Sequence, residues 1–108
     1  MQRALARHEI TVCLEDITQT VRRVLRTAGR FVTIYSAERL TDLLTHLRTT
    51  GIEPKSLRMI HSGAKTEAKL VLVEGIKGGR PGVKIGPPLI IYDEKGGYTQ
   101  EVEEMFSP

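Results

Sequence analysis

The fold is decided by residues 67–102, EAKLVLVEGIKGGRPGVKIGPPLIIYDEKGGYTQEV. Ala68 to Glu74 is rich in β-branched and aliphatic residues and predicts the strongest strand of the chain. It leads into a basic, glycine-rich loop, residues 75–86, and then into a Pro-Pro pair that favours extended backbone as far as Tyr92. After a turn, Thr99 is placed to cap a last short helix. This order of strand, loop, tail and helix indicates the end of an α/β domain.

A helix and a strand are expected near the start of the chain. Apolar residues recur at helical spacing from Leu14 to Leu25 and predict an amphipathic helix that Gly29 ends. Phe31 to Tyr35 is short, β-branched and aromatic, which is typical of a strand. Because this run is nearly continuously apolar, we expect both of its faces to be covered.

The middle of the chain predicts a second helix and a second strand. Ser36 can cap a helix whose leucines lie between Leu40 and Leu47, and Gly51 and Pro54 should end it. Leu57 to His61 predicts the next strand. Strand, helix and strand form a βαβ unit with parallel strands, but the link to the third strand is too short for a crossover. We therefore expect an α/β fold with a three-stranded mixed sheet, flanking helices and a reversed last strand near the edge of the sheet.

A sheet this narrow would leave the edge and a face of the Phe31 strand open, which proteins usually avoid. The chain is therefore interpreted as a single partial domain, residues 1–108, in which residues 75–108 form a loop and a tail that pack back. The alternative is pairing with a second copy through the open edge or the first helix, and we expect a homo-oligomer on this ground.

Composition narrows the functional classes. The chain has 108 residues and a net charge of +3, which suits a polyanionic partner and equally an ordinary solvated surface. Cys13 is the single cysteine, so an intrachain disulfide and a cysteine-rich metal site are excluded. No histidine pattern indicates a metal, and no apolar run is long enough to span a bilayer or to act as a signal core. We expect a soluble, cytoplasmic protein without a membrane partner.

The basic loop is the first candidate site. Lys77, Arg80 and Lys84 place three cations on flexible backbone, where they could follow a nucleic-acid phosphate chain or simply face solvent. The loop lacks the G-x-x-x-x-G-K-[ST] pattern, so it is not a nucleotide-binding loop. Few aromatic residues lie near it, which gives base stacking little support. Tyr92 and Tyr98 are interpreted as anchors of the tail to the sheet.

Several segments resemble a known enzyme class. The whole arrangement resembles the C-terminal half of a class I, Rossmann-like S-adenosylmethionine-dependent methyltransferase, in which the last strand is antiparallel and lies between the two before it. The finer resemblance is to the bacterial tRNA1(Val) adenine-N6 methyltransferase family, of the small-domain methyltransferase type. It is carried by ARHE at 6–9, YSAERL at 35–40, EAKLVLVEGIKGGRPG at 67–82 and PPLIIYDEKGGYTQEV at 87–102.

The resemblance implies S-adenosylmethionine as the cofactor of a complete parent protein. The family's glycine-rich cofactor loop, its ribose-binding acidic residue and its Asn-Pro-Pro-aromatic motif have no match in this sequence. We therefore assign no catalytic or cofactor-binding residue to this chain and expect it to bind no cofactor alone. In the family Arg7 and His8 would lie near the mouth of the active site, so both join the loop cations as candidate nucleic-acid contacts. An ordinary helix start is their alternative reading.

Three functions stay open. The first is a methyltransferase fragment that is inactive alone and whose parent methylates N6 of adenine in tRNA. A variant of it is a fragment of a small-molecule O- or N-methyltransferase. The second is a non-catalytic, basic module that binds RNA, and the third is a purely structural domain that associates with itself.

Overall fold

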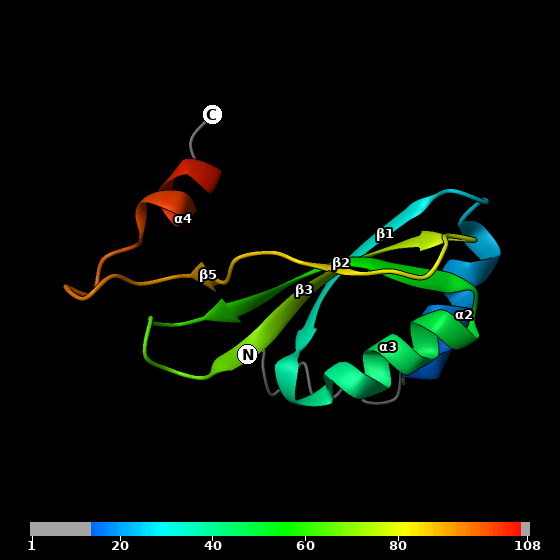
Figure 1. The fold of residues 1–108 in the computed structure, drawn as a ribbon, viewed down its shortest axis with the longest axis horizontal. Helices are drawn as coiled ribbons and strands as arrows, with labels where there is room; N and C mark the ends of the chain where they lie inside the picture. Colours follow the sequence, from blue (N-terminus) through cyan, green and yellow to red (C-terminus); the bar gives the residue numbers. More distant parts are fainter. Residues whose placement is uncertain (1–13, 107–108) are drawn as a thin grey trace.

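The computed structural model describes residues 14–106 as an α/β fold with one mixed sheet (Figure 1). Three long strands carry the sheet, as expected, and two strands of two residues extend it. The elements in chain order are α2 Leu14–Val24, β1 Arg30–Ser36, the 3-10 helix η2 Ala37–Arg39, α3 Leu40–Thr49, β2 Ile52–His61, β3 Ala68–Lys77, β4 Lys84–Ile85, β5 Leu89–Ile90 and α4 Gln100–Met105.

The strand order is β1-β3-β2-β4, and β5 also pairs with β2. β3 is antiparallel to both β1 and β2, so those two strands run parallel without touching. The reversed third strand is therefore confirmed. Its position is corrected, because it lies between its two neighbours and not near an edge. The order is the one that the resemblance implied.

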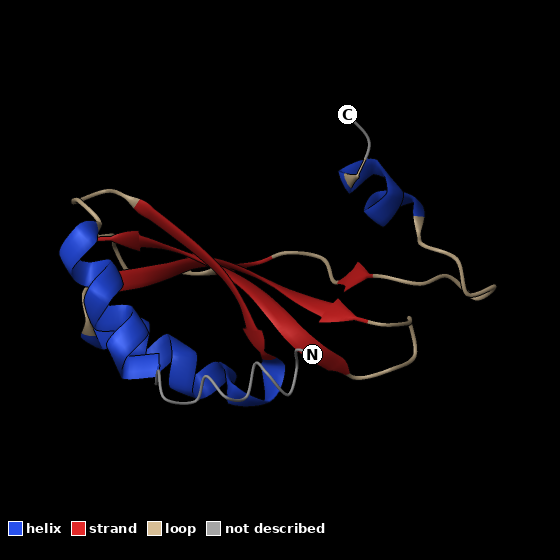
Figure 2. Ribbon diagram, turned by 180° about the vertical axis from the view of Figure 1, so that it is seen from behind, coloured by secondary structure: helices blue, strands red, loops and turns tan. Residues whose placement is uncertain are grey.

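Helices α2 and α3 lie together against one face of the sheet (Figure 2). Leu43 and Leu47 of α3 are buried, and they pack in one cluster with Val71 and Val73 from the centre of β3. Alternate residues of a strand point to the same face, so this face of β3 is fully covered. Burial of these aliphatic side chains is the main stabilising contribution to the layer.

The opposite face is covered only towards β2. There the tail supplies Leu89 and Val102, which are buried with Ile60. Towards β1 the face is bare, since Val32 is 54% exposed and Ile34 57% exposed. The expectation that the Phe31 strand is covered on both faces is wrong. Within residues 14–106, the outer edge of β1 also has no strand partner, as the narrowness of the predicted sheet indicated.

The tail pairs along the edge of β2, at the opposite end of the sheet from β1. β4 and β5 both pair with β2 in parallel, and Pro87 and Pro88 lie between them. Nε of Arg58 in β2 donates to the Pro87 carbonyl oxygen at 2.8 Å, which holds the proline pair against the strand. The loop predicted over residues 75–86 is therefore partly strand, because β3 extends to Lys77 at its start and β4 occupies Lys84–Ile85 near its end.

Two predicted boundaries are corrected. Helix α2 ends at Val24, ahead of Gly29, and Ala28 then adopts a positive φ of 70° in the turn before β1. Strand β2 begins at Ile52 and includes Pro54, which was expected to end the preceding helix. Its pairing with β3 shifts register directly after Pro54, and such a bulge is where a strand tolerates proline.

Candidate functional site at the carboxyl edge of the sheet

β1, β2 and β5 run in one direction, so they end at the same edge of the sheet, which we call the carboxyl edge. Open α/β sheets bind their ligands outside the carboxyl ends of such strands. The β2–β3 hairpin, residues 62–67, and the tail from Ile91 to Thr99 reach the same edge. The candidate site is therefore sought there.

The first feature of this edge is a hollow of about 630 Å³ between the hairpin and the tail, which we call the tail hollow. The tail is fixed beside the hairpin by backbone bonds, since Ile91 donates to the His61 carbonyl and Tyr92 to the Ser62 carbonyl, both at 2.9 Å. Its lining residues are Gly63, Ala64, Lys65, Thr66, Ile90, Tyr92, Asp93, Glu94 and Thr99.

Thr99 has a different role from the predicted one. It occupies the N-cap position of α4, but its side chain makes no capping bond there. Its hydroxyl donates instead to the Ile90 carbonyl oxygen at 2.6 Å and ties the two walls of the tail together. Asp93 stabilises the intervening turn, because its Oδ1 accepts from the backbone N–H groups of Lys95 and Gly97 at 2.9 and 3.0 Å.

The tyrosines at this edge do not behave as predicted. Tyr92 is 44% exposed and Tyr98 is 50% exposed, and their rings stack on each other at 5.4 Å between centroids. The tail is anchored by the buried side chains of Leu89 and Val102 and by backbone bonds. The two tyrosine rings are therefore not the predicted anchors on the sheet, and they form an exposed aromatic surface.

A second hollow, of about 480 Å³, lies at the β1 side of the same edge. It follows the carboxyl end of β1 and faces the start of β3. Charged groups of both signs line it, with Glu38 and Glu67 against Lys69. Such a lining suits a polar ligand without selecting an anion.

The predicted basic loop lies at the opposite edge, because antiparallel β3 carries the chain away from the carboxyl ends. Nζ of Lys77 donates to the carbonyl oxygens of Arg22 and Leu25, both at 2.7 Å, and so caps the C-terminal end of α2. Lys84 lies in β4 and is exposed. Lys77 is thus engaged within the fold, and contact of these cations with nucleic acid stays a prediction.

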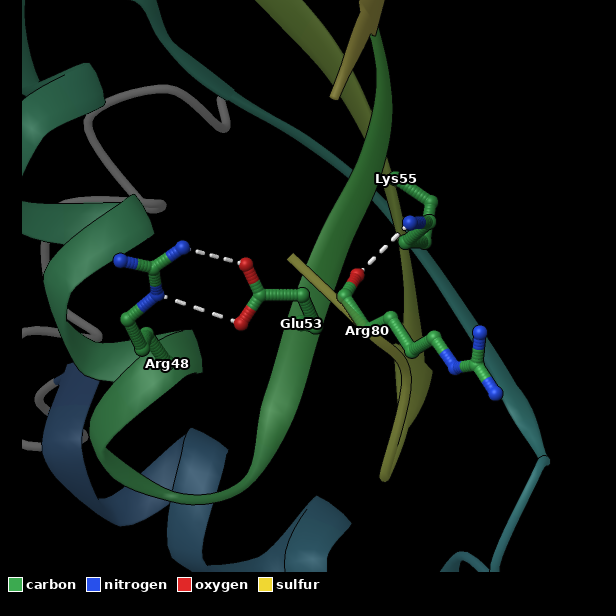
Figure 3. A network of polar contacts seen from close by, with 4 residues as sticks. All are labelled: Arg48, Glu53, Lys55 and Arg80. Atoms are coloured by element: carbon green, nitrogen blue, oxygen red, sulfur yellow. Dashed lines mark hydrogen bonds and ion pairs between the residues drawn. The ribbon is translucent and has the colours of Figure 1, made fainter. Parts of the chain in front are cut away.

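Arg80 lies next to Lys55, a cation that the sequence analysis did not name as a candidate. Nζ of Lys55 donates to the Arg80 carbonyl oxygen at 2.7 Å, while the Arg80 guanidinium points away from this contact (Figure 3). Lys55 comes from the bulge of β2, far from the loop in sequence, so its approach depends on the fold. Arg7 and His8, the other two candidates, lie outside the described residues.

An ion pair joins α3 to β2 next to these cations. Nε and Nη2 of Arg48 donate to the two carboxylate oxygens of Glu53 at 3.2 and 2.5 Å (Figure 3). These bonds lower the pKa of Glu53 and raise the pKa of Arg48. The pair borders a hollow of about 360 Å³ that Leu44, Pro54 and Val83 also line. Because both charges are already paired, we read it as a structural clamp.

The described residues do not fit a nucleoside-cofactor site. The passage from β1 to α3 at the carboxyl edge, residues 36–40, contains no glycine, the residue that lets a backbone approach a bound cofactor closely. The glycine-rich segment, residues 78–82, follows an antiparallel strand at the opposite edge and leads into no helix.

Residues 14–106 contain no group of three His, Cys, Asp or Glu side chains arranged to hold a metal ion. No helix in this part of the chain has the length and apolar character to cross a membrane.

Comparison with known proteins agrees with the topology. No family model and no curated protein matches this sequence. The solved structure of a predicted O-methyltransferase from Agrobacterium tumefaciens matches with a TM-score of 0.78 and 20% identity, over 85% of this chain and 44% of that chain. This chain thus spans less than half of that protein's length. At this identity the match shows the fold alone, and this chain has the same α/β fold as the matching part of that predicted O-methyltransferase.

Proposed function

We propose that this chain is the C-terminal part of an S-adenosylmethionine-dependent methyltransferase domain. The observation that carries the proposal is the position of β3, antiparallel between the parallel strands β1 and β2. The fold match to a methyltransferase supports it. In the complete domain the cofactor would supply an electrophilic methyl group.

The bare side of β1 is the surface where the rest of the domain would pack. The open strand edge offers backbone N–H and C=O groups, and Val32 and Ile34 offer apolar area beside it. This chain would then contribute the sheet, its helical cover and the walls of the two hollows at the carboxyl edge. Its own residues would shape the acceptor side of the site rather than hold the cofactor.

Two acceptors are considered for the complete domain. Adenine N6 in tRNA is favoured by the sequence resemblance and by the exposed cations Arg80 and Lys84 beside Lys55, which suit a polyanion. A small-molecule acceptor is favoured by the name of the structural neighbour, a predicted O-methyltransferase. We propose the tRNA base as the acceptor and keep the small molecule as the alternative outcome of the test.

The test is a chimera in which this chain replaces the matching part of the Agrobacterium tumefaciens protein. We expect a chimera with a single cooperative thermal transition to bind S-adenosylhomocysteine in calorimetry and to bind tRNA more tightly than the unmodified Agrobacterium tumefaciens protein does. Unchanged tRNA binding would select the small-molecule alternative. A cooperatively folded chimera that binds no S-adenosylhomocysteine would overturn the proposal.

The 108-residue chain alone provides the control. With labelled S-adenosylmethionine and tRNA we expect no turnover and, by calorimetry, no binding of S-adenosylhomocysteine that is tighter than the binding of adenosine. Micromolar binding that adenosine does not match would mean that a cofactor site lies within these residues. Salt-dependent RNA binding by a folded chimera that binds no S-adenosylhomocysteine would instead support the non-catalytic RNA-binding module.

A further inference from the structure

Three aromatic side chains form a row on the surface at the carboxyl edge. The Tyr92 and Tyr98 rings are nearly parallel, with an interplanar angle of 16°, and Phe106 lies against Tyr98 at 6.5 Å between centroids. None of the three is buried, and Phe106 is 77% exposed. Tyr98 lies in the middle of the row, so Tyr92 is an end of it.

Tyr92 is the member of the row that lines the tail hollow. One face of its ring rests on Tyr98, and with 44% of the residue exposed the ring keeps area for a ligand. The hollow's volume of about 630 Å³ lies within the range of small-molecule sites. The tail beside the hollow is held in place by its backbone bonds to the hairpin and by the bond from Thr99 to Ile90, so the position of the Tyr92 ring is fixed by the fold.

The lining favours a flat ligand that carries hydrogen-bond donors. An aromatic face stacks on a planar heterocycle, and stacking accepts every base because each has a π-face. Glu94 also lines this hollow, and a carboxylate accepts from exocyclic amines, whereas Oδ1 of Asp93 is already bonded within the turn. Lys65 is the one cation among the lining residues, so the lining has no excess positive charge to attract a phosphate chain by itself.

We propose that the tail hollow is a stacking site for an amine-bearing nucleobase, with Tyr92 as the platform and Glu94 as the acceptor for the amine. This deepens the proposed function and rests on it for the identity of the base as methyl acceptor. Base binding itself involves only this chain. The expectation that base stacking has little support was drawn from the basic loop, and the exposed aromatic residues lie at the opposite edge from that loop.

The experiment uses the 108-residue chain and two probes, 2-aminopurine riboside and a five-nucleotide RNA with 2-aminopurine at its centre. We expect quenching of the probe fluorescence on binding. Tyr92→Leu should weaken binding roughly 5- to 150-fold, the range for loss of one base–aromatic stack, and Tyr92→Phe should retain it. Phe106→Leu, an exposed aromatic outside the hollow, is the matched control and should bind as the wild type does.

A second variant keeps the test independent of the tyrosine pair. Glu94 is exposed, so Glu94→Ala, which removes the acceptor oxygens, should unfold at the wild-type temperature. In competition experiments the wild type should prefer adenosine to purine riboside, which lacks the amine, and Glu94→Ala should lose this preference. Quenching of both probes supports a site for free nucleosides and RNA bases alike, and quenching of the RNA alone supports a base within a strand. No quenching, or equal binding by wild type and folded Tyr92→Leu, overturns the proposal. Neither result depends on S-adenosylhomocysteine binding by the chimera, so the two proposals fail separately.

Discussion

Replacement of Lys77 by methionine tests whether this cation belongs to the fold or to a ligand. Methionine keeps an unbranched apolar stem but removes the two 2.7 Å bonds to the end of α2. The backbone of Lys77 stays paired, because its N–H donates to Gly29 and its carbonyl accepts from Ala28. A bond to a charged group contributes about 1.5–3 kcal/mol when buried, but this ammonium is only half-buried and water can replace it at the helix end. We therefore expect Lys77→Met to lower the free energy of unfolding by about 1–2 kcal/mol, including the lost interaction with the helix dipole.

Urea unfolding followed by circular dichroism is the assay. For a chain of this size the expected loss moves the midpoint by roughly 1 M urea. Lys84→Met is the matched control, since Lys84 is exposed in β4, and its free energy of unfolding should change by less than about 0.5 kcal/mol. If Lys77→Met unfolds like the wild type but binds RNA more weakly than Lys84→Met does, then the capping role is refuted.

Three further predictions concern the clamp, the sheet and its bare face. Arg48 lowers the pKa of Glu53 below its value of about 4.3 in the unfolded chain, so the stabilisation is present above that pH and is lost as pH falls through the folded-state pKa. Urea unfolding at decreasing pH should therefore show that the free energy of unfolding falls less steeply for Glu53→Gln than for the wild type. Identical pH dependence of the two proteins would contradict this. Gly75→Ala should cost about 1–3 kcal/mol in urea unfolding, because a β-carbon there would lie 2.8 Å from the Ile52 side chain, and an unchanged midpoint would rule out this tight contact. Val32→Lys should shift any self-associated chain towards monomer in light scattering, whereas association that is unaffected must use another surface.

The order of helices and strands could be predicted because it depends on local patterns. Leucines at helical spacing place α3, and the β-branched run from Ala68 places β3. The short link after His61 leaves β3 no room for a crossover, so its antiparallel direction also follows from the sequence. In contrast, β4 has only two residues, and its strand conformation depends on pairing with β2.

The features that the sequence did not reveal depend on distant partners. An apolar run looks the same whether a second layer covers it or not, so Val32 and Ile34 were expected to be buried. Lys77 seemed to be a loop cation because its partners at the end of α2 lie more than fifty residues away. The aromatic row at the carboxyl edge was missed for a related reason. Its members are spread from Tyr92 to Phe106, and only the turn and α4 bring them together.

The proline pair in the tail limits how copies of this sheet could grow. β4 and β5 cover the edge of β2, and Pro87 and Pro88 between them have no N–H to offer to another strand. That edge consists of two strands of two residues each, interrupted by the prolines, so among the described residues the outer edge of β1 is the long, uninterrupted edge for strand addition. When two chains pair through this edge, the outer edge of β1 is occupied in both of them. Association by this route ends at a closed pair and cannot propagate into a fibre.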